Sequence, residues 1–340
     1  MLISFLIILF AVFLVTVLIS RRLIPKLRSL KMGQPILDIG PRWHKSKEGT
    51  PTMGGLAFIA AAIVVTLCHG AFAVLANDGI EPLSELLPFY ITLLYAVLSG
   101  LIGVIDDRTK IVKTQNEGLT ASQKFLLQLL TASLYVIAMR LCGAITTEIK
   151  IPFFDISLDL GIFYYVIAIL LLTGMVNSVN LTDGIDGLAS AETCIVGAFF
   201  ALLAFTLGNE ALSAAAAITI GAALGFLVYN FYPARVFMGD TGSLFLGAMV
   251  VGMAFLADNP LIVLFAGLMY IIETASVMLQ TTYFKFTRIF CGEGRRIFKM
   301  SPIHHHFEMC GWNEVKIVSV FSVMALLFCA ITYILEYTIR

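Results

Sequence analysis

The chain has 340 residues, of which 59% are hydrophobic and only 13% are charged, and its formal net charge is zero. A soluble globular domain has roughly 25% charged residues, so this composition is that of a membrane protein and excludes a sizeable soluble domain. The balanced charge gives no indication of a nucleic-acid partner or a strongly acidic one.

Ten apolar runs follow one another along the chain. A helix that crosses the ~30 Å hydrocarbon core of a bilayer needs about 20 mainly apolar residues, and most of these runs reach that length. The first run has no basic residue before it and no cleavage site after it, so we expect a retained span and not a signal peptide. We predict an all-α polytopic membrane protein with about ten transmembrane helices, forming one integral membrane domain over residues 1–340. The runs cover residues 2–23, 53–76, 87–105, 121–145, 160–179, 188–207, 211–229, 243–257, 261–283 and 316–338.

Two features modify this simple series. Residues 148–160 alternate apolar and polar side chains, which predicts a short β-hairpin between the fourth and fifth runs. Pro152 would confine its strand to an edge of that hairpin. The ninth run continues almost unbroken to Phe290, so we expect it to tilt strongly, to break or to protrude.

The basic residues divide unevenly between the two sets of loops. Nineteen of the 22 Lys and Arg residues lie in one set, and the other set holds only Arg140, Lys150 and Arg340. Because cytoplasmic loops carry the excess of basic residues, we predict that the larger loops face the cytoplasm. With ten spans, both termini and the hairpin would then lie outside.

Five aspartates stand at the predicted cytoplasmic ends of spans, and their placement is informative because a carboxylate is costly in lipid. Any one of them alone could cap a helix or mark a turn. Five on one side, interleaved with glycines, are harder to explain by caps and turns alone. They are Asp106 and Asp107 after the third run, Asp183 and Asp186 in Asn180-Leu-Thr-Asp-Gly-Ile-Asp-Gly-Leu, and Asp240 in Val236-Phe-Met-Gly-Asp-Thr-Gly-Ser.

Carboxylate oxygens suit Mg²⁺, which usually takes one or two of them together with waters and phosphate oxygens. A diphosphate substrate would complete such a site. Asp106 and Asp107 are adjacent, and on a helix they would point about 100° apart. One of them is therefore expected to touch the metal or the nucleophile, while the other orients its neighbours.

Three lysines accompany these aspartates: Lys47, Lys110, which lies four positions after Asp106, and Lys124. The preference for basic residues on the cytoplasmic side explains most basic residues of the chain. A lysine is also a compact partner for phosphate, so these three are candidates for binding a nucleotide diphosphate and a lipid phosphate.

Three consecutive histidines stand in Ser301-Pro-Ile-His-His-His-Phe-Glu. Because Pro302 argues against a helix interior, we expect a loop there. In a loop near phosphates, imidazoles can donate hydrogen bonds or shuttle protons. A metal cluster is the competing interpretation, since Cys291 and Cys310 flank the run, although the spacing of the six cysteines matches no standard zinc pattern.

Taken together, these segments resemble the phospho-N-acetylmuramoyl-pentapeptide-transferase family, and the likeness extends over essentially the whole chain. The matching segments are Thr50-Pro-Thr-Met-Gly-Gly, Asp106-Asp107 with Lys110, Asn180-Leu-Thr-Asp-Gly-Ile-Asp-Gly-Leu-Ala, Pro233-Ala-Arg-Val-Phe-Met-Gly-Asp-Thr-Gly-Ser and Phe298-Lys-Met-Ser-Pro-Ile-His-His-His-Phe-Glu.

The resemblance implies that phospho-N-acetylmuramoyl-pentapeptide passes from its UDP derivative to undecaprenyl phosphate. The products would be the first lipid-linked peptidoglycan intermediate and UMP, and Mg²⁺ would be required. It also implies ten transmembrane helices with both termini outside, a cytoplasmic cleft, a place in the bacterial inner membrane, and a homodimer.

The resemblance assigns expected roles to single residues. Asp240 resembles the Mg²⁺ ligand, and Asp106 and Asp107 resemble the acidic pair, with Asp106 expected to be the base on the lipid phosphate. His304, His305 and His306 would contact phosphates, and Lys110 and Lys124 would supply the remaining cationic positions. The substrate pocket is expected at Lys47, Thr52, Asn180, Asp183, Asp186, Asn230 and Phe237, whose ring would stack on uracil.

Two other functions compete with this interpretation. A sister transferase that uses UDP-N-acetylglucosamine shares the aspartate pattern, but the histidine run favours the muramoyl enzyme. A membrane transporter would place polar residues near the midplane on broken helices, whereas these carboxylates cluster at span ends, with Glu273 as the main exception. Direct displacement by the lipid phosphate and a two-step route through an aspartyl intermediate both fit the acidic pair.

Overall fold

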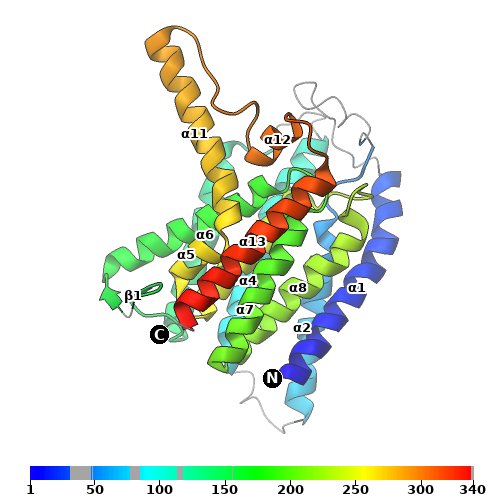
Figure 1. The fold of residues 1–340 in the computed structure, drawn as a ribbon. Helices are drawn as coiled ribbons and strands as arrows, with labels where there is room; N and C mark the ends of the chain where they lie inside the picture. The colour runs from blue at the N-terminus through cyan, green and yellow to red at the C-terminus, as the bar shows by residue number, and fades with distance from the viewer. Residues whose placement is uncertain (31–46, 48, 77–84, 113–117, 155, 338–340) are drawn as a thin grey trace.

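The computed structural model of the chain describes residues 1–30, 47, 49–76, 85–112, 118–154 and 156–337. Within these residues the protein is a bundle of long helices with one two-stranded sheet (Figure 1). The helices are α1 (Leu2–Ser29), α2 (Gly55–Ala76), α4 (Leu87–Val112), α5 (Ala121–Leu141), α6 (Ile162–Thr182), α7 (Leu188–Leu207), α8 (Glu210–Asn230), α9 (Gly239–Leu256), α10 (Val263–Ala266), α11 (Leu268–Cys291), α12 (Ile303–Glu308) and α13 (Glu314–Tyr337), with a 3₁₀ helix, η2, at Pro260–Ile262.

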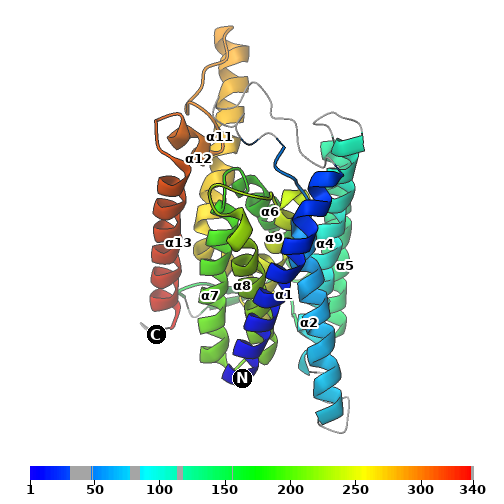
Figure 2. The ribbon, with the colours of Figure 1, turned by 90° about the vertical axis from the view of Figure 1, so that its right-hand side faces the viewer.

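Nine helices among the described residues are long and apolar enough to cross a membrane. A tenth span results if the pair Pro260–Ala266 and Leu268–Cys291, which is bent by 78°, counts as one. The prediction of about ten spans is thus confirmed. The ninth apolar run breaks, as one of the three expected outcomes, and α11 then projects beyond the bundle (Figure 2).

The centre of the bundle consists of α8 and α9, which are mostly buried, whereas α1 and α5 expose much of their apolar surface. Small residues allow the close helix contacts, as is usual in membranes where apolar side chains gain little by leaving lipid. A Cβ added to Gly221 of α8 would lie 2.5 Å from the backbone oxygen of Leu9 in α1. On α4, a Cβ added to Gly103 would lie 2.2 Å from the backbone oxygen of Asp240 in α9.

The predicted hairpin is present as β1 (Glu148–Ile151) paired antiparallel with β2 (Ile156–Asp159), with Ile149 opposite Leu158. Pro152 follows the last residue of β1, where it takes no hydrogen bond away from the ladder. Glu336 near the end of α13 accepts a hydrogen bond from the backbone N–H of Phe153 at 2.5 Å. Lys150 forms an ion pair with Asp258 at 2.6 Å.

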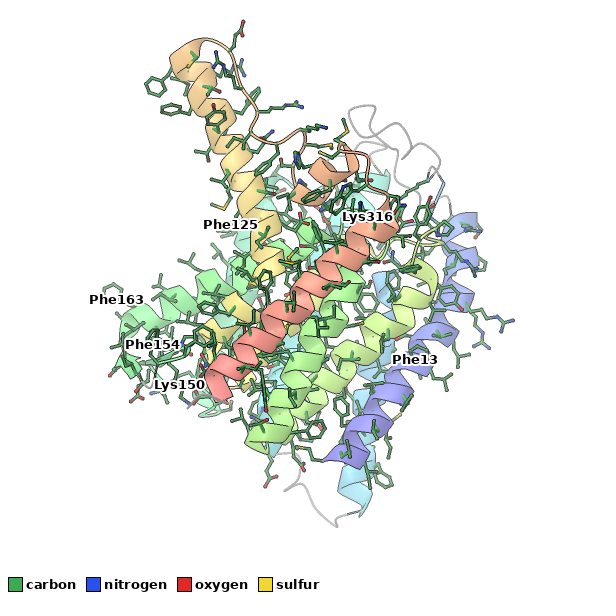
Figure 3. All side chains as sticks on the ribbon, in the orientation of Figure 1. Phe13, Phe125, Lys150, Phe154, Phe163 and Lys316 are labelled. Atoms are coloured by element: carbon green, nitrogen blue, oxygen red, sulfur yellow. The ribbon has the colours of Figure 1, made fainter. Side chains whose placement is uncertain are left out.

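Both chain ends lie towards the part of the bundle that carries this hairpin, and α12 lies at the opposite part (Figures 1 and 2). We call these the hairpin end and the site end. Figure 3 shows Lys150 at the hairpin end and Lys316 at the site end. The predicted orientation of the termini relative to the membrane stays a prediction.

The histidine run corrects one prediction. Residues Ile303–Glu308 form the short helix α12 and not a loop. Pro302 precedes the first helical residue, and there its missing N–H removes no intrahelical hydrogen bond, so the proline starts the helix where an interior proline would break it.

Candidate active site

Three carboxylates meet where α4 crosses the start of α9. Asp106 and Asp107 lie in the last turns of α4, and Asp240 lies in the first turn of α9. Among the residues that the structure describes, these are the His, Cys, Asp or Glu side chains whose ligand atoms gather as a possible metal site, all within 4.8 Å of one another. The alternative of a Cys and His metal cluster around α12 therefore finds no support in the described part of the chain.

Asp107 accepts hydrogen bonds from the backbone at the start of α9. Its Oδ1 accepts the N–H of Asp240 at 3.2 Å, and its Oδ2 accepts the N–H and hydroxyl of Thr241 at 3.0 and 2.7 Å. A carboxylate at a helix start satisfies backbone donors that have no partner within the helix. The contact is so close that a Cβ on Gly239, where φ is +70°, would lie 2.4 Å from Asp107 Oδ2. Asp107 thus orients the segment that carries Asp240.

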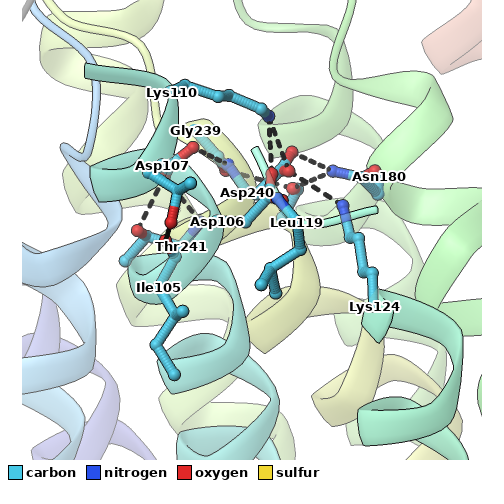
Figure 4. A network of polar contacts seen from close by, with 12 residues as sticks. Ile105, Asp106, Asp107, Lys110, Leu119, Lys124, Asn180, Gly239, Asp240 and Thr241 are labelled. Carbon is cyan, nitrogen blue, oxygen red and sulfur yellow. Dashed lines mark hydrogen bonds and ion pairs between the residues drawn. The ribbon is translucent and has the colours of Figure 1, made fainter. Parts of the chain in front are cut away.

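Asp106 and Asp240 face two lysines (Figure 4). Lys110 Nζ lies 2.7 Å from Asp106 Oδ2 and 2.9 Å from Asp240 Oδ2, and Lys124 Nζ lies 2.8 Å from the same Asp240 oxygen. The Asn180 amide donates to Asp240 Oδ1 at 2.8 Å, and the Leu119 N–H donates to Asp106 Oδ1 at 2.7 Å. The adjacent aspartates point to different partners, as expected for neighbours on a helix.

A cavity of about 300 Å³ opens beside Asp240. All seven predicted substrate residues line it, so the fold brings the separate sequence motifs to one place. The lining residues are Lys47, Thr52, Lys110, Asn180, Asp183, Gly184, Ile185, Asp186, Asn230, Phe237, Gly239 and Asp240. Burial, and then the nearby carboxylates of Asp240, Asp107 and Asp186, raise the pKa of Asp183 to about 8.

Two of the lining residues, Phe237 and Asn230, form hydrogen bonds with backbone groups in the wall of the cavity. The backbone N–H of Phe237 donates to the Pro51 oxygen at 2.9 Å, and the Phe237 oxygen accepts the N–H of Gly54 at 2.9 Å. Asn230 donates its amide to the Val236 oxygen at 3.0 Å. These bonds fix the backbone of the segment before α9, so that the half-buried Phe237 ring stands at the cavity.

Lys47 is held by two acids at the far wall. Its ammonium lies 2.6 Å from Asp186 Oδ1 and 2.7 Å from Glu314 Oε1. Glu314, at the start of α13, also accepts the backbone N–H of Asp186 at 2.9 Å. Sequence reasoning missed Glu314, because an acid in the first turn of a helix is commonly a partner of that helix alone. Only the folded chain shows that it reaches Lys47.

The histidines face protein partners. His304 is fully buried with Nδ1 at 3.0 Å from Glu273 Oε2, and His305 contacts Glu308. His306 Nδ1 accepts the backbone N–H of Lys299 at 3.1 Å. None of the three lines the 300 Å³ cavity within the described residues, so their predicted contact with phosphate stays a prediction.

A second, larger cavity of about 710 Å³ lies between α5, α6 and α11. Its lining is mainly apolar and includes Phe125 and Leu170, while the side-chain amides of Gln128 and Asn177 bond to each other at 2.8 Å. Lys124 lines this cavity and also contacts Asp240, which lines the first one. The Lys124 ammonium therefore stands between the two.

Comparisons with known proteins give matches to family models and to whole relatives. Residues 89–258 match the model of glycosyl transferase family 4, and residues 47–59 match phospho-N-acetylmuramoyl-pentapeptide-transferase signature 1. The chain is similar to the phospho-N-acetylmuramoyl-pentapeptide-transferase of Staphylococcus carnosus, with 43% identity over 93% of this chain and 94% of that protein. It is 44% identical to the protein of the same name in Clostridium perfringens, over 94% of this chain and 93% of that protein. The identity to the protein of that name in Clostridium botulinum is 45%, over 92% of this chain and 90% of that protein.

Proposed function

The chain belongs to the phospho-N-acetylmuramoyl-pentapeptide-transferase family, and from this premise we propose how its residues carry out the transfer. It is a multi-pass membrane transferase of the phosphosugar type. The donor is the UDP derivative of N-acetylmuramoyl-pentapeptide, and the acceptor is a membrane lipid, for which we propose undecaprenyl phosphate. One observation carries the proposal: the ammonium groups of Lys110 and Lys124 both form ion pairs with Asp240. These groups lie between the polar 300 Å³ cavity and the mainly apolar 710 Å³ cavity.

The donor nucleotide occupies the 300 Å³ cavity in this proposal. Phe237 offers an aromatic face on which uracil can stack. Thr52, Asn180, Asp183 and Asn230 supply polar groups around the nucleoside, and Lys47 and Asp186 close the far wall. The diphosphate then lies beside Lys110 and Lys124, whose ammonium groups balance its charge.

The acceptor lipid enters through the 710 Å³ cavity. Its apolar lining suits a polyprenyl chain, and Lys124 at its polar end suits a phosphate. The lipid phosphate thus arrives on the opposite side of Lys124 from the nucleotide, which is the arrangement that a transfer between the two requires.

The residues fit a Mg²⁺ ion at Asp240. Asp106, Asp107, Asp183 and Asp240 bring four carboxyl groups, whereas Lys110 and Lys124 bring two ammonium groups. Asp240 Oδ1 accepts the Asn180 amide and, as a carboxylate oxygen, retains a second lone pair for a metal. When bound, Mg²⁺ would neutralise charge on the diphosphate during transfer.

We propose direct displacement. An oxygen of the lipid phosphate attacks the phosphorus next to the sugar, and the bond from that phosphorus to the oxygen of UMP breaks, so that UMP leaves with the electron pair. Asp106 takes any proton still carried by the lipid phosphate. Asp107 has both oxygens occupied by α9, which argues against an aspartyl intermediate on it and for a positioning role.

Two variants separate the roles of metal ligand and base. Asp240→Asn removes the charge that holds a hard cation and should lower turnover about a hundred-fold or more. Asp106→Asn should abolish transfer yet leave Mg²⁺-dependent binding of the UDP-sugar largely intact. Release of UMP from purified protein and calorimetric binding with and without Mg²⁺ measure both effects.

The exposed Asp258 at the hairpin end supplies the control, since Asp258→Asn should change neither quantity. Near-normal turnover of Asp240→Asn at low Mg²⁺ would show that the metal is held elsewhere, with Asp183 or Asp107 as the next candidates.

The remaining proposals concern the whole protein. We propose that residues 1–340 form one domain in the bacterial inner membrane, with the site end facing the cytoplasm and both termini outside. The uneven distribution of basic residues supports this orientation. We also propose a homodimer, as the family resemblance implies, which native mass spectrometry from detergent micelles would test.

A further inference from the structure

A glutamate and a histidine form a fully buried pair beneath the donor cavity. Glu273 of α11 and His304 of α12 have no exposed surface, and Glu273 Oε2 lies 3.0 Å from His304 Nδ1. We assign Glu273 as the acceptor at this contact, an ionised carboxylate that takes the proton of the Nδ1–H group. In the neutral ring the other nitrogen, Nε2, is then the one without a proton.

The second nitrogen faces the backbone of the donor cavity. His304 Nε2 is buried and has no hydrogen-bond partner among the described residues. It packs against Gly184 so closely that a Cβ added to this glycine would lie 2.1 Å from Nε2. Gly184 lines the donor cavity and directly follows Asp183. The ring therefore stands between Glu273 in the bundle and the segment that carries Asp183.

We propose that Glu273 and His304 are positioning residues for the donor site. Glu273 fixes the ring with its proton on Nδ1, and the ring supports the backbone at Gly184, which holds Asp183 and its neighbours at the nucleotide. His304 acts through this contact and not by touching phosphate. The proposal rests on the assignment of the 300 Å³ cavity to the donor.

Several features make this arrangement specific. A ring with its proton on Nε2 would turn the lone pair of Nδ1 towards the Glu273 carboxylate, and the hydrogen bond between the two buried groups would be lost. Glycine is required at position 184 because any larger residue would meet the ring. The role also gives a reason for Glu273, the one glutamate that sequence analysis singled out as lying away from the span ends.

Glu192 offers a matched control. It lies on α7, is as fully buried as Glu273, and neither of its carboxylate oxygens has a hydrogen-bond partner in the described structure. It forms no hydrogen bond with His304. A general sensitivity of the bundle to loss of a buried carboxylate would therefore appear in Glu192→Gln, whereas loss of the support for Gly184 would not.

The test compares donor and acceptor parameters in full-length protein in detergent. Glu273→Met keeps the length of the side chain but removes its strong acceptor, and should raise the Kd for the UDP-sugar about ten-fold or more, with the KM for lipid acceptor within about two-fold. Glu273→Gln retains an oxygen that accepts the Nδ1–H and should stay within about three-fold. Glu192→Gln should match the parent in all of these.

A double-mutant cycle approaches the same contact from the other side. Gly184→Ala places a methyl group against the His304 ring and should also raise the donor Kd. The increase should be smaller in the Glu273→Met background, where the ring can move away. Additive effects would overturn the proposal, as would a loss of kcat in Glu273→Met with unchanged donor Kd. If Glu273→Met and Phe237→Ala both leave the donor Kd unchanged, the donor does not occupy the 300 Å³ cavity, and the assignment on which this proposal rests fails. A Kd that rises in Phe237→Ala alone overturns only the positioning role of Glu273 and His304.

Discussion

At Asp183 the folded chain makes a carboxyl group difficult to ionise. Burial and the neighbouring carboxylates raise its pKa to about 8, compared with about 3.9 for an aspartate in an unfolded chain. Between these two values the folded protein binds more protons than the unfolded one. The contribution of Asp183 to stability therefore becomes less favourable as the pH rises from about 4 to about 8, and it levels off above that range.

The variant Asp183→Asn should remove this dependence. We expect the apparent melting temperature of the nucleotide-free parent to fall more steeply between pH 5 and pH 8 than that of the variant, because asparagine does not titrate. Thermal unfolding followed by intrinsic fluorescence in matched buffers measures both slopes. Parallel curves would mean that Asp183 ionises normally in the folded protein.

Phe237 gives a second prediction at the scale of one side chain. Stacking of a base on an aromatic ring contributes about 1 to 3 kcal/mol, so Phe237→Ala should weaken binding of the UDP-sugar by roughly ten-fold or more. Phe154→Ala, at an exposed ring of the hairpin end, is the control (Figure 3). Unchanged affinity for the nucleotide would reduce Phe237 to a packing role.

At the scale of the helix, the crossing of α4 and α9 sets the distance between the acidic pair and Asp240. A Cβ on Gly103 would lie 2.2 to 2.4 Å from backbone atoms of Asp240 and Thr241, which cannot move without shifting α9. Gly103→Ala should therefore lower turnover at least about ten-fold by displacing Asp240. Transfer assays on purified protein measure this loss.

One turn earlier, Gly100 supplies the comparison. Its added Cβ would meet the terminal methyl of Ile59 at 2.8 Å and the backbone oxygen of Thr241 at 3.2 Å, a much milder approach to α9 than that at Gly103. Gly100→Ala should therefore lose much less activity than Gly103→Ala. Equal losses would argue that the helix contact as a whole is at fault, and not the placement of Asp240.

The limits of sequence reasoning are clearest at element ends. Hydropathy located the long helices, but it placed the eighth run at residue 243, whereas α9 begins at Gly239 because Asp107 binds its first backbone N–H groups. Sequence reasoning also predicted a loop for the histidine run, because it treated Pro302 as a helix breaker and not as the residue before a helix start. Motifs identified the cavity residues, yet the partners Glu273 and Glu314 are 31 and 267 residues away from the side chains they hold. Contacts at that separation follow from packing alone.

At the scale of the whole molecule, the two ends of the bundle differ in chemistry. The site end carries the aspartates, lysines and α12, whereas the hairpin end carries the short sheet and its ion pair between Lys150 and Asp258. Because the donor is a charged nucleotide sugar, which does not cross a bilayer unaided, the site end must face the compartment that supplies it. The excess of basic residues in the loops supports our proposal that this compartment is the cytoplasm.

Two single-cysteine proteins test this orientation. The exposed Cys310 follows α12 at the site end, and Lys150→Cys would place a thiol on the exposed hairpin at the other end. With the other cysteines changed to serine or alanine, a membrane-impermeant maleimide should label the hairpin thiol in intact cells and Cys310 only in inverted vesicles. The physical reason is that the reagent reaches only one face of a sealed membrane. Labelling of Cys310 in intact cells, with the hairpin thiol protected, would place the aspartates outside and reverse the proposed topology.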